Sequence, residues 1–371
     1  MASPPKRDQL LWLLGAAALA VLFAQTWTRA HRPGGIDLTT YLEAARAVQR
    51  VENPYALSLA FPYVYPPFFA FALIPLAYVP ADLALLIWFT ASVGAIVWAC
   101  HEVLMLAYPE LRARSVTPFL ATLFAVAYTV FQSNLRNAQV NFIIVALAIA
   151  ALRARATPAR GVDWALATVI KIVPGVLAPY YVCRREWRTC AMAALALIAL
   201  CLAPAVTLGA QVVSLHREYA TTFLAGSFAG AGQELDFSLG GMLALAVGAE
   251  GRWVRLLGVA LPVAIAFVAD CRAGRTARVN AFAFALYLAV IPLASPKSEV
   301  HHLAFALPAA ALAFGAVWFE LERRQPLPAL LVMTLTTYLA ALLVQAWTGP
   351  LLFVSLCALT GGLCALMTRK I

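Results

Sequence analysis

The chain has 371 residues, of which 63% are hydrophobic and 12% are charged, and its formal net charge is +10. A soluble protein of this length could not bury so much apolar surface, so the composition excludes a soluble enzyme or binding domain. A basic chain can bind nucleic acid, but in a membrane protein the excess usually reflects arginine retained in cytoplasmic loops. We therefore expect no nucleic-acid partner.

Apolar runs of about 20 residues, the length of a helix that crosses a bilayer, recur along the chain. The predicted spans are 9–28, 81–107, 116–134, 140–154, 187–208, 253–271, 279–294, 301–319, 328–347 and 350–368. Basic residues mark alternate loops, which places both termini in the cytoplasm. Lys6 and Arg7 precede the first span, and no small-residue cleavage site follows it, so we expect an uncleaved helix. The sequence thus predicts an all-α polytopic membrane protein, with residues 1–371 forming a single integral membrane domain.

Segment 162–182 begins and ends beside basic residues of the same predicted side, and the run Lys171-Ile172-Val173-Pro174-Gly175 interrupts it. One helix cannot return to the side on which it started, so we predict a broken hairpin of two short helices. Counting both halves gives about twelve membrane helices. An ionisable group at the depth of Lys171 generally faces a partner or water, although a lysine can also extend to the interface. As a compact point charge, Lys171 is a candidate for binding phosphate.

The first long outer loop, 29–67, carries a carboxylate close to the end of the first span. Asp37 begins a predicted amphipathic helix in this extracytoplasmic loop, and two interpretations stay open. Asp37 could cap the helix with its side-chain oxygen, or it could take a proton from a hydroxyl group. Tyr41, Tyr55 and Tyr65 in the same loop could form an interfacial aromatic belt or a platform for a sugar ring.

A dense polar turn joins two predicted spans and holds Asn134, Arg136, Asn137, Gln139 and Asn141. It could be only a solvated turn. Alternatively, its carboxamides could bond sugar hydroxyls, and Arg136 could pair bidentately with phosphate. The second large outer loop, 209–252, contains a short apolar helix, predicted at 238–248.

The last polar outer segment carries Lys297, Glu299, His301 and His302. Adjacent helical residues point about 100° apart, so the two histidines do not have the spacing of a zinc site. One imidazole could instead contact a phosphate or orient a carboxylate, or the group could simply be the polar start of a helix. We expect neither a metal nor a cofactor.

Taken together, these motifs resemble one family in their order along the chain. They are Asp37-x₃-Tyr41, Asn53-Pro54-Tyr55, Tyr65-Pro66-Pro67, Gln139-Val140-Asn141, Lys171-Ile172-Val173-Pro174 and Ser295-Pro296-Lys297-Ser298-Glu299-Val300-His301-His302. From about residue 9 to 320 the chain resembles glycosyltransferase family 87, which contains the polyprenol-phosphate-mannose-dependent α-mannosyltransferases of mycobacterial phosphatidylinositol mannoside synthesis.

The resemblance implies a GT-C glycosyltransferase fold in a bacterial plasma membrane, with the active site on the extracytoplasmic face. It also implies a polyprenyl-monophosphate sugar donor, inversion at the anomeric carbon, and Asp37 as the catalytic aspartate. Glu299-Val300 stands where the family often has an aromatic residue, so the acceptor does not carry over.

We therefore expect an inverting hexosyltransferase, with mannose as the family default and a glycolipid or glycan acceptor. Asp37 would be the general base, which requires Asp37 and Lys171 to face one cavity. The expected donor-phosphate residues are Lys171, Arg136, His301, His302 and Lys297, and the expected sugar or acceptor residues are Tyr41, Tyr55, Tyr65, Asn137, Gln139, Asn141 and Glu299. A transporter or flippase of a lipid-linked sugar, or a polysaccharide ligase or polymerase, is the alternative.

Overall fold

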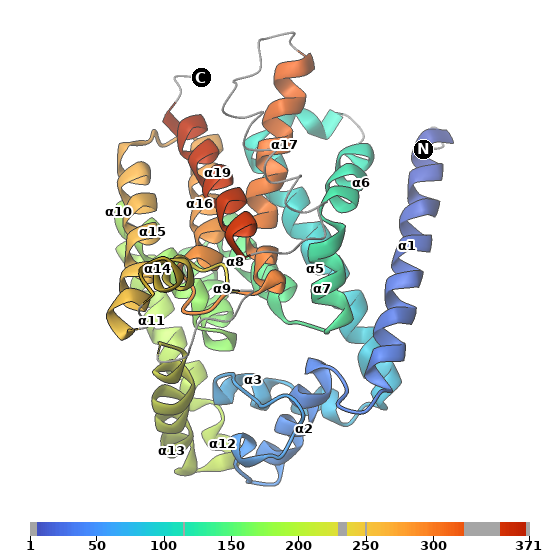
Figure 1. Ribbon diagram of the computed structural model, residues 1–371, viewed down its shortest axis with the longest axis vertical. Coiled ribbons are helices and arrows are strands. Elements are labelled where there is room, and N and C mark those ends of the chain that lie inside the picture. The colour runs from blue at the N-terminus through green and yellow to red at the C-terminus, as the bar shows by residue number, and fades with distance from the viewer. Residues whose placement is uncertain (1–5, 114–115, 229–235, 249–250, 323–348, 369–371) are drawn as a thin grey trace.

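The structure is a computed structural model that describes residues 6–113, 116–228, 236–248, 251–322 and 349–368. Within these residues the regular elements are helices, and there is no β-strand. Long helices run side by side through most of the molecule, and a group of short helices that includes α2, α3, α12 and α13 covers one end (Figure 1). The predicted span 328–347 and parts of loop 209–252 lie outside the described residues.

Among the described residues, 6 helical stretches are long and apolar enough to cross a membrane, or up to 7 if one bent pair counts as a span. They are Asp8–Ala30, Ala81–Ala107, Trp187–Leu208, Arg252–Arg272, Ala277–Ala294 and Val300–Trp318. The protein is thus a multi-pass membrane protein. The predicted number of about twelve is not confirmed, because several predicted spans are broken into shorter helices.

The long helices are α1 (Lys6–Ala30), α5 (Ala81–Ala107), α11 (Trp187–Leu202), α15 (Arg252–Arg272), α16 (Ala277–Ala294), α17 (Leu307–Glu322) and α19 (Gly349–Thr368). Helix α16 lies at the centre, and every residue from Ala281 to Ala294 is buried. It packs against α15, α17, α19 and α5. Because a helix that is apolar all round can be buried on all sides, its lack of a polar face suits this position.

Two predicted spans, 116–134 and 140–154, form three helices. They are α6 (Thr117–Val126), α7 (Tyr128–Arg136) and α8 (Asn141–Arg153). The chain bends by 112° between α7 and α8, and Ala138 in the turn has a left-handed backbone, with φ of 52°. Helix α7 packs on α1, whereas α8 packs on α5. The polar turn predicted at 134–141 is therefore a true reversal between packed helices.

The break predicted at Lys171 is confirmed. Helix α9 (Thr157–Ile170) ends there, Lys171 has an extended backbone, and η3 (Val173–Leu177) and α10 (Ala178–Cys183) follow. Pro174 cannot donate a backbone hydrogen bond, which favours the interruption. The indole N–H of Trp164 donates to the carbonyl of Pro174 at 3.0 Å and holds the second half against α9.

Short helices form one end of the molecule, the end at which α1 leads into α2. They are α2 (Asp37–Gln49), η1 (Pro54–Ala56), α3 (Pro67–Ala72), α4 (Ile74–Ala77), α12 (Ala205–Leu208), α13 (Gln211–Glu218) and the π-helical turn η4 (Tyr219–Leu224). The predicted apolar face of α2 is buried, including Leu38 and Leu42. Gly34 and Gly35 join α1 to α2 with φ of 91° and 62°, a conformation that glycine adopts without a steric penalty.

Four shorter elements complete the described chain: η2 (Pro109–Ala113), η5 (Gly226–Phe228), α14 (Leu239–Val247) and η6 (Val300–Ala306). Helix α14 confirms the short apolar helix predicted within loop 209–252. It packs on α15, and η6 packs on α16, α7 and α8. Helix α16 thus joins the segment that holds the two histidines to the central bundle.

Candidate active site

Asp37 lies at the first helical residue of α2, but its side chain does not cap the helix. Ile36 occupies the N-cap position, and the Asp37 carboxylate accepts a hydrogen bond from the side-chain amide of Gln139. The backbone N–H of Asp37 also donates to the carbonyl of Asn137 at 3.2 Å. Two contacts, one from the carboxylate and one from the backbone, therefore tie Asp37 to the polar turn between α7 and α8, about a hundred residues away along the chain.

Lys171 reaches the same polar turn from the broken segment. Its Nζ lies 3.1 Å from Oδ1 of Asn141 and 3.1 Å from Nε2 of His302. It also lies 5.9 Å from the centre of the Tyr65 ring, within the range of a cation–π contact. Asn141 is itself fixed, because its amide donates to Oδ1 of Asn134 and to the carbonyl of His301, both at 3.1 Å. The lysine thus contacts three separate segments of the chain.

The pKa of Asp37 responds to burial and to three neighbouring charges, those of Lys171, Arg29 and Glu299. Burial raises the pKa of Asp37 from 3.8 to about 6, and the positive charges of Lys171 and Arg29 act against the rise, while Glu299 adds to it. Because the burial effect is the largest, the carboxylate holds its proton more strongly than an ordinary aspartate. Asp37, Lys171 and Glu299 therefore form one electrostatically coupled cluster.

The segment 295–302 distinguishes the two histidines. Nδ1 of His302 accepts the backbone N–H of Glu299 at 3.0 Å, and its Nε2 faces Lys171. Nδ1 of His301 instead lies 3.8 Å from the Glu299 carboxylate, which also pairs with Lys297 at 3.0 Å. The imidazole that faces Lys171 is therefore that of His302.

The tautomer of His302 makes this contact unusual. Because Nδ1 accepts an obligatory backbone donor, the proton of a neutral ring is on Nε2. That N–H then points toward Lys171 Nζ, which is also a donor when protonated. Two hydrogen-bond donors consequently face one another, an arrangement that an anionic oxygen placed beside both nitrogens would satisfy.

The tyrosines form a wall behind the cluster. Tyr41 and Tyr65 share a hydrogen bond of 2.9 Å between their hydroxyls, and Tyr55 donates to the carbonyl of Tyr65 at 2.8 Å. Tyr41 is buried and packs edge-to-face on Phe69. Of the three predicted tyrosines, Tyr65 lies beside Lys171, whereas Tyr41 supports it from within the core.

Arg136 does not contact Lys171. It lines a cavity between α1 and α7, together with Arg29 and Arg32. Asn137, next in the chain, donates its amide to the carbonyl of Ser133 at 2.8 Å and gives its own carbonyl to Asp37. The residues predicted to bind one phosphate are thus divided between two places.

A buried ion pair behind segment 295–302 was missed by the sequence analysis. Asp236 accepts the backbone N–H groups of Ser238 and Ser298 at 3.0 and 2.9 Å, and it pairs with Arg255 at 2.5 Å. Arg255 also donates to the carbonyl of Pro296 at 2.5 Å. The available signal was an arginine at the start of the apolar span 253–271, where a charge must find a partner.

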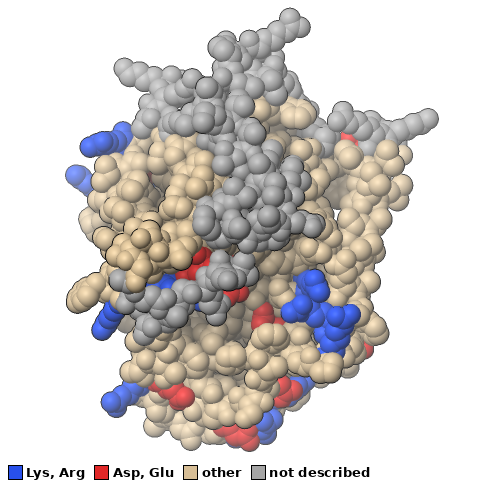
Figure 2. Space-filling model, in the orientation of Figure 1, with Lys and Arg blue, Asp and Glu red and all other residues tan. Residues whose placement is uncertain are grey.

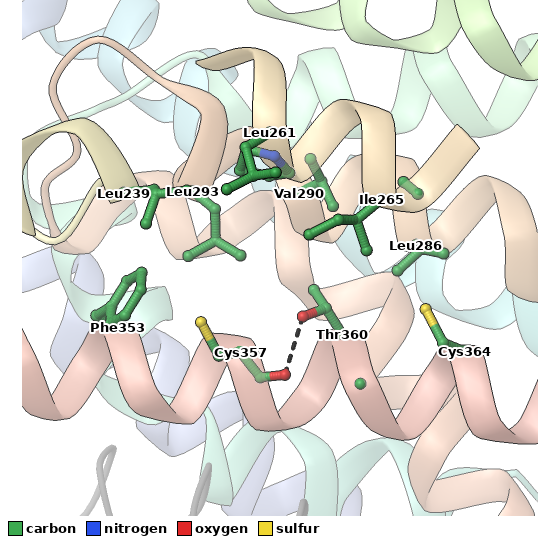
Figure 3. Close-up of a pocket in the computed structure, with 13 residues that line it drawn as sticks. Leu239, Leu261, Ile265, Leu286, Val290, Leu293, Phe353, Cys357, Thr360 and Cys364 are labelled. Atoms are coloured by element: carbon green, nitrogen blue, oxygen red, sulfur yellow. Dashed lines mark hydrogen bonds between the residues drawn. The ribbon is translucent and has the colours of Figure 1, made fainter. Parts of the chain in front are cut away.

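An apolar cavity of about 350 Å³ opens between α15, α16 and α19. Figure 3 shows Leu261 and Ile265 of α15 facing Phe353 and Cys357 of α19 across it. Leu293, two residues before Ser295, lies at one side of the cavity. Among the described residues, no group of three or more histidine, cysteine, aspartate or glutamate side chains is arranged to hold a metal ion.

The fold and site thus define a multi-pass helical membrane protein with a charged polar cluster where its short helices meet the bundle. The chain belongs to glycosyltransferase family 87, whose model matches residues 63–296, and the predicted family is confirmed. The matched range includes Gln139, Asn141 and Lys171, whereas Asp37 and the two histidines lie outside it.

One relative is a polyprenol-phosphate-mannose-dependent alpha-(1-2)-phosphatidylinositol mannoside mannosyltransferase from Mycobacterium tuberculosis (strain ATCC 25618 / H37Rv), 29% identical over 216 residues. The match covers 52% of this chain and 49% of the relative, so the chain spans about half the length of that protein. A crystal structure of ArnT from Cupriavidus metallidurans bound to undecaprenyl phosphate is also similar, with 14% identity and a TM-score of 0.49, over 97% of this chain and 77% of that one.

Proposed function

We propose that this protein is an inverting membrane glycosyltransferase with the GT-C fold expected for its family. It would take a hexose, mannose by family default, from a polyprenyl-monophosphate donor and transfer it to a hydroxyl of a glycolipid or glycan. Family membership and the donor named for the mycobacterial relative support the proposal. We place the reaction on the extracytoplasmic face of a bacterial plasma membrane, with both termini in the cytoplasm.

The observation that carries the proposal is the joint position of Asp37, Lys171 and His302 around the polar turn. The Asp37 carboxylate accepts a hydrogen bond from Gln139, and Lys171 donates one to Asn141 of the same turn. A candidate base and two groups that can donate hydrogen bonds to a phosphate thus lie near one turn, and a displacement at a sugar carbon needs such fixed placement. The sequence alone does not show that these groups lie close together, because Asp37, Lys171 and His302 come from three distant segments.

In the proposed step, Asp37 removes the proton of the acceptor hydroxyl. The hydroxyl oxygen forms a bond to the anomeric carbon while the bond from that carbon to the phosphate oxygen breaks, and the phosphate leaves with the electron pair. Phosphate is a good leaving group, so the second carboxylic acid that ordinary glycosides need is unnecessary. Attack opposite the phosphate inverts the anomeric configuration.

We assign the leaving phosphate to Lys171 and His302. Negative charge grows on the phosphate oxygens as the bond breaks, so fixed donors directed at it lower the barrier selectively. The two donors that face one another at 3.1 Å share no acceptor, and a phosphate oxygen beside both nitrogens would supply one. His301 and Lys297 contact Glu299 rather than Lys171, so we assign them to holding Glu299 in place beside the site.

Gln139 is the best candidate for a sugar hydroxyl. Its Nε2 donates to Asp37, while its Oε1 is buried without a hydrogen-bond partner. A buried acceptor left unpaired costs about 1–3 kcal/mol, and a hydroxyl donor from the substrate would recover this energy. Asn141 differs, because both ends of its amide are engaged within the protein, so we assign it to positioning Lys171.

The test is Asp37→Asn in liposomes supplied with a polyprenyl-phosphate-mannose donor and a membrane lipid extract. Loss of the base should lower the rate of sugar transfer by a factor of about 10²–10⁴. The matched control is Asp82→Asn, an exposed acid that contacts Trp27 and His31, which should transfer at the wild-type rate. Near-wild-type transfer by folded Asp37→Asn protein would contradict the general-base role. Donor moved across the bilayer without any transfer would instead support a flippase.

A further inference from the structure

Two cysteine side chains from different helices lie against one another, outside the proposed active site. Cys183 is the last residue of α10, and Cys271 lies one residue before the end of α15. Both are free thiols, and their sulfur atoms are 2.7 Å apart. A disulfide forms only where the fold already brings two sulfurs together, so this pair meets the first requirement for one.

The residues next to the two cysteines hold the helices in this position. Arg184, which follows Cys183, forms an ion pair with Asp270, which precedes Cys271. Asp270 is buried, and the guanidinium carbon of Arg184 lies 3.8 Å from the centre of the Tyr180 ring. Because a buried ion pair is costly to break, the contact between the sulfurs follows from the packing of α10 on α15 and not from one flexible side chain.

The cysteine pair is accessible at the edge of the bundle. Cys271 is exposed, whereas Cys183 is half-buried. Arg272 ends α15, and Arg275 donates to Sγ of Cys183 at 3.3 Å, so positive charge surrounds the pair. Figure 2 shows basic atoms along the edge of the molecule where α10 and α15 lie in Figure 1. A small anionic reagent is attracted to such a surface and reaches Cys271 first.

The expected compartment decides what kind of disulfide this is. Arg272 and Arg275 belong to a basic loop that we place in the cytoplasm, with both termini. Glutathione and thioredoxin keep cytoplasmic thiols reduced, so disulfides there are usually transient and respond to oxidation. We propose that Cys183 and Cys271 are a modification site, a dithiol that forms a reversible disulfide by exchange with a small disulfide of the oxidised-glutathione class.

The exchange takes place in two steps. The thiolate of Cys271 attacks one sulfur of the small disulfide, whose S–S bond breaks, and one small thiolate leaves with the electron pair. The thiolate of Cys183 then attacks the Cys271 sulfur of this mixed disulfide, and the second small thiolate leaves. The two cysteines lose two electrons, the small disulfide gains them, and the two cysteine protons end on the two small thiols.

The disulfide joins two elements that hold opposite sides of the Lys171 cluster. Cys183 ends the segment of η3 and α10 that follows Lys171, and Arg255, near the other end of α15, donates to the carbonyl of Pro296. A crosslink that closes a long loop stabilises the fold mainly by restricting the unfolded chain. Oxidation should therefore raise the unfolding temperature by about 5 °C.

The experiment treats purified full-length protein in detergent with oxidised glutathione, blocks the remaining thiols and reads tryptic peptides by mass spectrometry without a reductant. Trypsin releases Cys183 in peptide 172–184 and Cys271 in peptide 256–272. We expect the two peptides to be joined with the loss of two hydrogens, in protein that runs as a monomer on a denaturing gel. Reduced glutathione should separate them again.

Serine variants test the order of the two steps. Cys183→Ser should keep glutathione attached to Cys271, because the second thiol is gone, and its unfolding temperature should not rise on oxidation. Cys271→Ser should slow the modification of Cys183 by about tenfold or more, because the exposed thiol is gone. The matched control is Cys190→Ser, a half-buried cysteine on α11, which should form the joined peptides as wild type does.

Four results would overturn the proposal. Separate glutathione adducts on both peptides, with no joined species, would mean that the sulfurs do not meet. Joined peptides that are present before oxidation and resist reduced glutathione would mean a permanent structural disulfide. Joined peptides found only in a dimer would place the bond between two copies, and equal loss of product in Cys190→Ser would mean unselective oxidation. None of these measurements requires sugar transfer, so a failure of the proposed function leaves them unaffected.

Discussion

Asp37 combines two opposing effects within one carboxyl group. Burial raises its pKa to about 6, and the cations Lys171 and Arg29 limit the rise. A base with this pKa is mostly ionised near neutral pH, yet it accepts a proton more readily than an aspartate at 3.8. This environment therefore suits the general-base role that we propose for Asp37.

This pKa predicts the acid limb of the activity. A general base works only when deprotonated, so kcat/KM should fall by about tenfold for each pH unit below about 6 and level off at higher pH. The measurement is the pH profile of transfer from about pH 4.5 to about pH 8. A profile that stays flat down to about pH 5 would mean that the essential group is a different one.

Lys171→Met should affect the donor in two ways. Losing a fixed cation at the leaving phosphate should lower kcat by about 10²–10³ and also weaken donor binding. Removing one of the charges that oppose the rise should move the acid limb of the profile to higher pH. Arg50→Met, a change in exposed basic charge, is the control for kinetics with a polyprenyl-phosphate-mannose donor. Equal kinetics for wild type and Lys171→Met would remove the phosphate role.

Segment 295–302 is held in place by elements that touch no proposed substrate. Asp236 bonds the backbone of Ser298, and Arg255 bonds the carbonyl of Pro296. His302 follows four residues after Ser298, so the buried pair fixes the segment that aims the imidazole at Lys171. We therefore regard Asp236 and Arg255 as positioning residues.

Breaking that pair should reduce both stability and kcat. Asp236→Asn removes the buried carboxylate that pairs with Arg255, which should cost about 3–5 kcal/mol in the free energy of unfolding. Asp236→Asn/Arg255→Met should recover part of that loss, because it removes both members of the buried pair. Thermal unfolding and kcat are measured together, with Glu52→Gln as the exposed control, expected to cost at most about 1 kcal/mol. Full stability in the single variant would contradict the argument.

At the scale of the whole molecule, the apolar cavity of Figure 3 lies between α15, α16 and α19. A polyprenyl donor needs an apolar path for its chain, and Leu293, which lines this cavity, is two residues before Ser295 in the chain. We propose that it holds part of that chain. Its lining by leucine, isoleucine and valine suits an isoprenoid by the ordinary hydrophobic effect.

Filling the cavity tests this assignment. Val290→Trp should raise KM for a long polyprenyl-phosphate donor by about tenfold, and it should leave KM for a short-chain donor such as citronellyl phosphomannose nearly unchanged. Ile198→Trp, at an exposed position on α11, is the matched control. An equal rise for long and short donors would point to a general packing defect rather than to chain binding.

Much of the architecture followed from local features of the sequence. Apolar runs predicted a helical membrane protein, and the Lys171–Gly175 run predicted the helix break, because proline and an intramembrane lysine act locally. The motif order indicated the family. The number of membrane helices did not follow, since the ends and kinks of short helices depend on the neighbours against which they pack.

The candidate site was only partly accessible from the sequence. The residues that surround Lys171 could be named, but not their pairing: Gln139 holds Asp37, His302 rather than His301 faces the lysine, and Arg136 lines a cavity between α1 and α7 instead. Composition and periodicity report what each segment is, and they determined a polytopic helical protein with polar loops. Contacts between segments a hundred or more residues apart depend on how the helices pack, and only the tertiary structure decided those.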